Sequence, residues 1–124
     1  MNDARLILAS DRVSRGERED ATADGVRRVL ELAGFSLESI IAVPDEQDAL
    51  RAAIIAAAGE VALVLTSGGT GIAARDVTPE ATVSACHTML PGFGERMRTV
   101  SFASVPTAIL SRQTAGIRNS CLML

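Results

Sequence analysis

The sequence contains no lysine: all 12 of its basic residues are arginine. This absence excludes a Schiff-base lysine, a lysine general base and a Walker-type phosphate loop, each of which requires that side chain. Tryptophan and tyrosine are also missing, and three phenylalanines are the only aromatic residues. Stacking platforms for bases are therefore absent, and a net charge of −3 offers no field that attracts a polyanion. We expect no nucleic-acid partner.

Cysteine is scarce, and Cys86 and Cys121 lie far apart with no second thiol near either. That spacing fits neither a CxxC redox motif nor a zinc site, so we expect both to be buried, reduced side chains. No apolar run approaches the ~20 residues that a membrane span requires. The N-terminal Met-Asn-Asp-Ala-Arg leads straight into a strand, so no signal peptide is expected. These features predict a cytoplasmic protein with no membrane partner.

The composition, 48% hydrophobic and 22% charged over 124 residues, predicts one globular domain without linkers or repeats. Apolar spacing and turn residues predict strand 6–9, helix 22–33, strand 37–43, helix 46–58, strand 61–66, a helix that begins near Thr78, and a helix at 93–100. Thr78 is the expected N-cap of its helix, with Pro79 at the first helical position. Strands that alternate with helices argue for an open, mostly parallel sheet.

The C-terminal segment 107–124 is predicted to form two strands joined by a turn around Gly116. Such a hairpin adds an antiparallel element to the sheet. The expected fold class is therefore α/β: three layers, a mostly parallel sheet with helices on both faces, and a terminal β-hairpin.

Three polar segments, 10–19, 44–46 and 67–76, directly follow predicted strands. In open α/β sheets, ligands bind in the crevice at the carboxyl ends of the strands. The three segments are therefore expected to converge on one ligand site.

The strongest single signal is the run Thr66-Ser67-Gly68-Gly69-Thr70-Gly71. Glycines without a Cβ let backbone N–H groups converge on a phosphate, and the hydroxyls add further donors. The alternative is a plain flexible turn. The buried strand before this run and the helix start Asp76-Val-Thr-Pro-Glu80 after it favour phosphate binding.

Two aspartates near these strand ends each have two interpretations. Asp76 either stabilises the dipole of the following helix or holds Mg²⁺ against phosphate oxygens. Asp45 either forms an Asx-turn or is a second acidic ligand.

Arg12 could pair with phosphate in a bidentate manner. Ser111-Arg112-Gln113, expected between the two terminal strands, either binds an anionic or amide-bearing ligand or only decorates the hairpin.

Together these motifs resemble the MogA/MoaB family of molybdenum cofactor biosynthesis proteins, which includes the G domain of gephyrin. The segments that carry the resemblance are Ser10-Asp11-Arg12 with Ser14 and Gly16, Pro44-Asp45-Glu46, 65–72, 75–82, 91–95 with Met97 and Arg98, and 110–113 with Gly116 and Arg118. Because the family usually continues beyond this point, residues 1–124 are expected to be one molybdopterin-binding domain without its C-terminal turn and helix.

The resemblance implies an enzyme, a molybdopterin adenylyltransferase that uses ATP and Mg²⁺ and releases pyrophosphate. Asp45 and Asp76 would be its catalytic residues and would organise the Mg²⁺. The residues implied for substrate and phosphate binding are Ser10, Asp11, Arg12, Thr66, Ser67, Gly68, Gly69, Thr70, Gly71, Pro91, Gly92, Glu95, Ser111 and Arg112. The resemblance also implies a homotrimer and a partner protein that inserts molybdenum.

Two other functions are compatible with the same sequence. One is a MoaB-like protein that binds pterin or nucleotide without turnover, and the other is a trimeric scaffold whose site has lapsed. Since the glycine run and both aspartates are present, we favour the enzyme.

Overall fold

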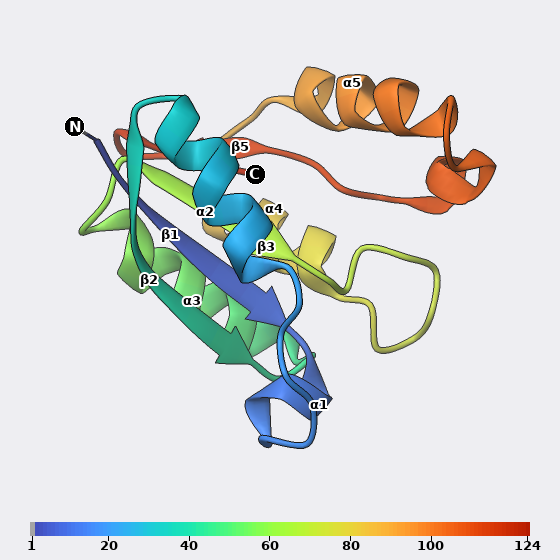
Figure 1. Ribbon diagram of the computed structural model, residues 1–124, viewed down its shortest axis with the longest axis horizontal. Helices are drawn as coiled ribbons and strands as arrows, with labels where there is room; N and C mark the ends of the chain where they lie inside the picture. Colours follow the sequence, from blue (N-terminus) through green and yellow to red (C-terminus); the bar gives the residue numbers. More distant parts are fainter. Residues whose placement is uncertain (1) are drawn as a thin grey trace.

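The computed structural model describes residues 2–124 and contains one six-stranded sheet in the order β2-β1-β3-β6-β5-β4 (Figure 1). Its strands are β1 (Asn2–Ala9), β2 (Phe35–Val43), β3 (Leu63–Ser67), β4 (Thr88–Met89), β5 (Gly116–Arg118) and β6 (Cys121–Met123). Strands β2, β1, β3 and β6 run parallel, whereas β4 and β5 form an antiparallel edge. The predicted α/β class with a mostly parallel sheet is confirmed.

The helices are α1 (Asp11–Ser14), α2 (Ala23–Leu32), α3 (Gln47–Ala58), α4 (Thr78–Ala85) and α5 (Pro91–Phe102), with a 3₁₀ helix, η1 (Pro106–Leu110). Helix α5 begins at Pro91, two residues earlier than predicted, because proline's preset φ and missing N–H suit a first helical turn. Over residues 2–124, no helix has the length and apolar character needed to cross a membrane.

The helices cover both faces of the sheet, and Figure 1 shows α2 and α3 on opposite sides of β1 and β2. Successive side chains of a strand point to opposite faces. Ile7 of β1 accordingly packs in the core cluster with α3 and α4, while Leu6 and Leu8 pack with Leu30 of α2. The three predicted layers are therefore present.

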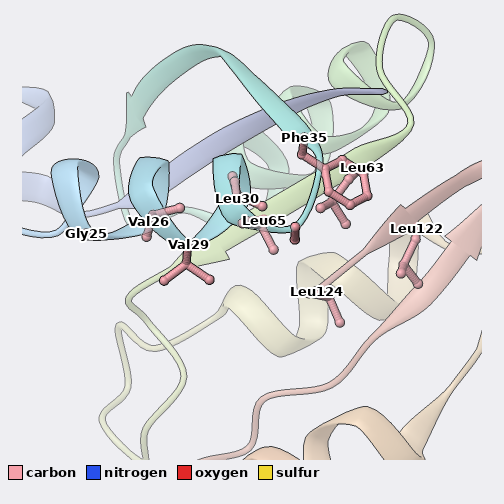
Figure 2. A pocket seen from close by; sticks show the side chains of 10 residues that line it. Gly25, Val26, Val29, Leu30, Phe35, Leu63, Leu65, Leu122 and Leu124 are labelled. Carbon is pink, nitrogen blue, oxygen red and sulfur yellow. The ribbon is translucent and has the colours of Figure 1, made fainter. Parts of the chain in front are cut away.

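Helix α2 does not cover the whole of the sheet face on which it packs. Beside it lies a groove of about 540 Å³, lined by apolar side chains of α2, β3 and β6 (Figure 2). Val29 of α2, which is 65% exposed, forms one wall, and Leu65 and Leu124 lie opposite. The groove offers no polar side chain to orient a polar ligand.

Residues 91–110, here called the arm, form α5 and η1 and lie beyond the antiparallel edge of the sheet (Figure 1). The chain then returns to β5 through residues 111–115. The arm exposes six large hydrophobic side chains: Phe93, Val100, Phe102, Val105, Ile109 and Leu110. Arg98 of α5 ties the arm to the returning segment, because its Nη1 donates to the carbonyl oxygens of Ser111 (3.3 Å) and Gln113 (2.8 Å).

The terminal hairpin exists, but its predicted turn around Gly116 is wrong. The turn lies at Asn119-Ser120, where Asn119 adopts a left-handed φ of 55° that asparagine tolerates better than most residues. Gly116 is the first residue of β5, and glycine is needed there because a Cβ would approach Cys86 Sγ to 2.5 Å. Ser111-Arg112-Gln113 consequently precedes the hairpin, and the whole segment 107–110 is 3₁₀ helix.

The two cysteines are free, as predicted, and Cys121 on β6 is buried. The prediction that Cys86 is buried is wrong, because it lies at the end of α4 and is only half-buried.

Candidate active site

The carboxyl ends of β1, β2 and β3 meet at one edge of the sheet, as the sequence predicted. From β1 the chain passes through α2 to β2 on one side, and from β2 through α3 to β3 on the other. This reversal makes the crevice between β1 and β3 a topological switch point, the usual ligand position in such sheets. The Ser10 N–H donates to the carbonyl oxygen of Val43 at 2.9 Å, which joins the ends of β1 and β2.

Asp11 and Asp45 form a reciprocal pair across these two strand ends. The Asp11 N–H donates to Asp45 Oδ2 (3.1 Å), and the Asp45 N–H donates to Asp11 Oδ1 (2.9 Å). Each carboxylate therefore satisfies the other residue's backbone, and the two side chains are held in defined positions.

The glycine loop, residues 67–71, turns away from β3 in a conformation that only glycine adopts easily. Gly68 and Gly69 have φ angles of 90° and 68°. A Cβ on Gly68 would collide with the carbonyl oxygen of Ala9, and one on Gly69 would lie 2.5 Å from Thr78 Oγ1. The loop therefore lies directly against the end of β1 and the start of α4.

Thr78 sets the direction of the loop's peptide groups. Its Oγ1 donates to the carbonyl oxygen of Gly68 (2.8 Å), and its N–H donates to that of Gly69 (3.1 Å). With this hydroxyl engaged, Thr78 is the first residue of α4 and not the predicted N-cap, a position that Val77 takes. Among residues 2–124, the N–H groups of Gly69, Thr70 and Gly71 have no hydrogen-bond acceptor. Such unpaired amides are what an anion-binding turn offers to a phosphate.

Asp45 carries a buried oxygen without a partner. Its Oδ2 is satisfied by Asp11, but its Oδ1 has no donor within the described chain. A Cβ on Gly69 would lie 3.2 Å from this oxygen, so Oδ1 faces the glycine loop. Burial raises the pKa of Asp45, because desolvation disfavours the charged carboxylate. A divalent cation would satisfy this oxygen and favour the charged carboxylate.

Asp76 lies on the other side of the loop. Its Oδ2 accepts the N–H of Ala73 (3.0 Å), and its own N–H donates to the carbonyl oxygen of Ala73 (3.0 Å). A Cβ on Gly71 would approach Asp76 Oδ2 to 2.8 Å. The Asp76 charge contributes to the raised pKa of Asp45. The two predicted metal ligands therefore flank the same loop.

The donor set suits Mg²⁺ bound together with phosphate. Residues 2–124 contain no cluster of three or more His, Cys, Asp or Glu side chains placed to hold a metal by themselves. Mg²⁺ usually takes one or two carboxylates and completes its octahedron with phosphate oxygens and water. Asp45, with its unpartnered oxygen, and Asp76 fit that requirement.

Arg112 holds the far end of the loop through all three of its guanidinium nitrogens. Nε donates to the carbonyl oxygen of Gly71 (2.8 Å), Nη2 to that of Asp76 (2.7 Å), and Nη1 to Glu80 Oε2 (2.7 Å). Its backbone N–H also donates to the carbonyl oxygen of Thr70 (2.7 Å). Arg112, predicted as a substrate contact, is engaged in positioning the loop.

Arg75 closes the loop against the end of β1. It forms a bidentate ion pair with Asp11, with Nη2–Oδ1 and Nη2–Oδ2 distances of 2.7 Å and an Nε–Oδ2 distance of 3.1 Å. Hydrogen bonds from Arg75 are the main reason that the pKa of Asp11 is lowered. This pair was not predicted, because the two residues lie 64 positions apart in the sequence.

The other predicted site residues fall into two groups. Ser10, Arg12, Ser67 and Thr70 lie at the strand ends, and there Ser10 Oγ accepts the N–H of Val13 as the N-cap of α1. The Thr66 hydroxyl points into the sheet and donates to the carbonyl oxygen of Leu124 (2.9 Å).

The predicted pterin-side residues lie farther along the chain. Pro91, Gly92 and Glu95 are exposed on α5, and within residues 2–124 no hydrogen bond joins them to the glycine loop. Ser111 stands between α5 and Arg112, and its carbonyl oxygen accepts from Arg98. Among residues 2–124, the hydrogen bonds of Arg98 link the arm to the segment 111–113, and Arg112 of that segment bonds the glycine loop.

A family model described as "Probable molybdopterin binding domain" matches residues 5–124. The chain belongs to this family. The resemblance to the MogA/MoaB proteins is confirmed by its relatives. A Helicobacter pylori protein named molybdopterin adenylyltransferase is 49% identical over 123 residues, which cover 96% of this chain and 70% of the relative. The Escherichia coli protein of the same name is 44% identical over 131 residues, with coverages of 100% and 67%.

Solved structures agree with this assignment. The crystal structure of the molybdopterin biosynthesis enzyme MoaB from Thermus thermophilus matches with a TM-score of 0.92 at 39% identity. The match covers 100% of this chain and 79% of that one. The molybdopterin-binding fold thus extends over all the elements described above.

Sequence reasoning missed Thr78, Arg75 and Glu80 as residues that shape the site. Each acts through a contact with a distant part of the chain, and such a pairing leaves no local pattern. The one available signal was their occurrence within the run 75–82, which carries the family resemblance.

Replacing Gly69 with alanine is expected to lower the free energy of unfolding by about 2–4 kcal/mol, from left-handed strain and the collision with Thr78. The matched control is Gly25→Ala in α2, where a Cβ meets no atom within 4 Å. That variant should gain about 0.5–1 kcal/mol from helix propensity. Urea unfolding of both variants measures the difference, and equal effects would contradict the close packing of the loop.

Replacing Asp45 with asparagine is expected to stabilise the metal-free protein near neutral pH. A raised pKa means that the folded state binds the proton more tightly than the unfolded state. The cost of the charged carboxylate is therefore absent below the ordinary carboxyl pKa and grows as pH rises through the raised value. Unfolding with a chelator present should show the advantage of Asp45→Asn at pH 7 and its loss near pH 3. A pH-independent difference would refute this explanation.

Proposed function

We propose that this chain adenylylates molybdopterin, the activity that the names of its relatives state for those proteins, and that it uses ATP and releases pyrophosphate. The structural observation that supports the proposal is that three N–H donors and one carboxylate oxygen, all without hydrogen-bond partners within residues 2–124, lie at the same loop. The N–H groups of Gly69, Thr70 and Gly71 lack acceptors among the described residues, and Asp45 Oδ1, which faces Gly69, lacks a hydrogen-bond donor there. A phosphate with a divalent cation satisfies the N–H donors and the carboxylate oxygen at once.

The reaction forms a bond between an oxygen nucleophile of the pterin and the α-phosphorus of ATP, while the bond to the β-phosphate breaks. Such transfers depend on positioning and charge neutralisation more than on covalent catalysis. The loop amides bind phosphate oxygens and orient the chain of phosphates. No lysine is needed for this role, and the sequence has none.

Asp45 and Asp76 are the residues that would hold Mg²⁺ in this proposal. The cation would neutralise the negative charge that gathers on the phosphate oxygens during transfer. Asp11 keeps Asp45 in place through the two reciprocal hydrogen bonds, and the Ala73 N–H orients Asp76. Ser10 and Arg12 at the end of β1, together with Ser111, Pro91, Gly92 and Glu95, are proposed to line the pterin side.

The activity is tested by pyrophosphate release from purified protein supplied with molybdopterin, ATP and Mg²⁺. Asp45→Asn and Asp76→Ala should each lower kcat/KM by about 10²–10³-fold, the usual effect of removing one electrostatic group from a transition state. Asp48→Asn, which removes an exposed carboxylate from the first turn of α3, is the control and should retain activity.

Binding of pterin or ATP without pyrophosphate would instead favour the MoaB-like function. The absence of any binding would favour a scaffold.

We further propose a homotrimer whose subunits associate through the arm. Exposed apolar patches of this kind mark interaction surfaces, and six large hydrophobic side chains of the arm are solvent-accessible in the single chain. We also propose that the protein is cytoplasmic and that a partner protein inserts the molybdenum.

Ile109→Asp, at a position that is 68% exposed, should convert trimers to monomers because it places a charge in the arm surface. The matched control is Val83→Asp on α4, which is 53% exposed and outside the arm. Light scattering during size-exclusion chromatography gives the mass of each variant. If Ile109→Asp keeps the mass of the parent protein, the arm is not the interface.

A further inference from the structure

Two arginines reach the turn that follows the glycine loop, and they differ in how many groups hold them. Arg112 donates to Gly71, Asp76 and Glu80, so moving it would release the loop itself. Arg75 is held by one carboxylate, that of Asp11, and its side chain is 60% exposed. Within residues 2–124, its Nη1 donates no hydrogen bond. Arg75 therefore has fewer partners to give up than Arg112, and the hydrogen bonds that Arg112 makes to the loop do not depend on it.

The backbone that carries Arg75 is fixed even though its side chain is exposed. Ala73 and Asp76 bond each other in both directions, and Arg112 holds the carbonyl oxygens of Gly71 and Asp76. Arg75 thus projects from a closed turn with both ends clamped. A change of partner needs only rotation of the side chain.

Asp11 presents to Arg75 the same chemistry that a phosphate would present. Its two oxygens accept from Nε and Nη2, and bidentate pairing of a guanidinium is equally suited to carboxylate and phosphate. The pair is next to the proposed phosphate position, because Asp11 Oδ1 lies 2.9 Å from the Asp45 nitrogen and Asp45 Oδ1 faces Gly69. Asp45 therefore lies between the glycine loop and the Asp11–Arg75 pair.

We propose that Arg75 binds the phosphate chain of the nucleotide, and that Asp11 holds Arg75 before the nucleotide binds, as a substitute for that phosphate. The inference rests on the proposed function in one respect, that the glycine loop receives a polyphosphate. On binding, the guanidinium exchanges the Asp11 carboxylate for phosphate oxygens, and Asp11 keeps its hydrogen bond from the Asp45 N–H. Arg75 then supplies the mobile cation that a lysine provides in other phosphate loops, and this chain has no lysine.

If Arg75 exchanges the Asp11 carboxylate for phosphate, substitutions at Asp11 and Arg75 should have effects that a purely structural ion pair would not produce. If Asp11 competes with phosphate for Arg75, removing the Asp11 charge strengthens phosphate binding, while removing Arg75 weakens it. If the pair only holds the loop closed, the two substitutions break the same contact and weaken binding alike. The signs of the two effects therefore separate exchange from support.

The probe is inorganic tripolyphosphate with Mg²⁺, titrated calorimetrically into the full chain. Asp11→Asn should raise the affinity about two- to fivefold, the range that an exposed ion pair supports. Arg75→Ala should lower it about tenfold, as expected for a lost charge-assisted hydrogen bond. In the Asp11→Asn/Arg75→Ala double variant the gain should vanish, leaving the affinity of Arg75→Ala.

A control separates exchange from a general change in charge. Glu17→Gln removes the same charge from an exposed arginine pair, Arg15–Glu17, near the same strand end. It should leave tripolyphosphate affinity unchanged within twofold. Thermal unfolding of every variant checks that the fold is retained, and Arg75→Lys should recover part of the lost affinity.

Several results would overturn the inference. These are no tripolyphosphate binding by the parent protein, a loss of affinity in Asp11→Asn, or a gain that persists in the double variant or matches that of Glu17→Gln. Pyrophosphate release is measured separately, so a chain that shows the predicted exchange but no turnover would refute the adenylyltransferase proposal alone. Turnover with unchanged tripolyphosphate affinity in Arg75→Ala would refute this inference alone.

Discussion

The site depends on the close approach of the glycine loop to the end of β1. Gly68 lies against the Ala9 carbonyl with no room for a Cβ, and Gly69 lies against Thr78. This contact brings the loop amides opposite Asp45, which itself is held by Asp11 at the next strand end. Without the approach of the glycine loop to β1, the three strand ends would still be adjacent, but their polar groups would not face a common point.

Arginine replaces lysine throughout this site, and its geometry explains how one fold can do without lysine. A guanidinium offers several donors in a rigid plane, so it can join backbone carbonyls and carboxylates at once. Arg98 joins the arm to residues 111–113, and Arg112 joins that segment to the glycine loop. Arg75 joins the following turn to β1. Three segments distant in sequence are thereby held together by side chains that remain charged at any physiological pH.

The sequence was sufficient to predict the sheet, the meeting of its strand ends and the glycine loop, because these follow from local apolar runs and from the rule for parallel sheets. It was insufficient where a residue's role is set by a distant partner. Thr78 looked like a helix cap, yet its hydroxyl is taken by Gly68. Gly116 looked like a turn residue, yet it is required by the approach of Cys86. The hydrogen bonds of Arg112 to the loop were likewise not predicted, because its partners lie 36 and 41 positions away.

The bonds from Thr66 to Leu124 have a consequence for the order in which this molecule folds. Both the N–H and the hydroxyl of Thr66 donate to the Leu124 carbonyl oxygen, at 2.8 and 2.9 Å. Strand β3, which leads into the glycine loop, is therefore an open sheet edge until β6 docks against it. Pairing across so long a stretch of sequence is a slow, late step for a folding chain. During synthesis, residues 67–71 leave the ribosome well before the strand and the arginine that order them. The ordering of the glycine loop thus depends on residues that are synthesised after it.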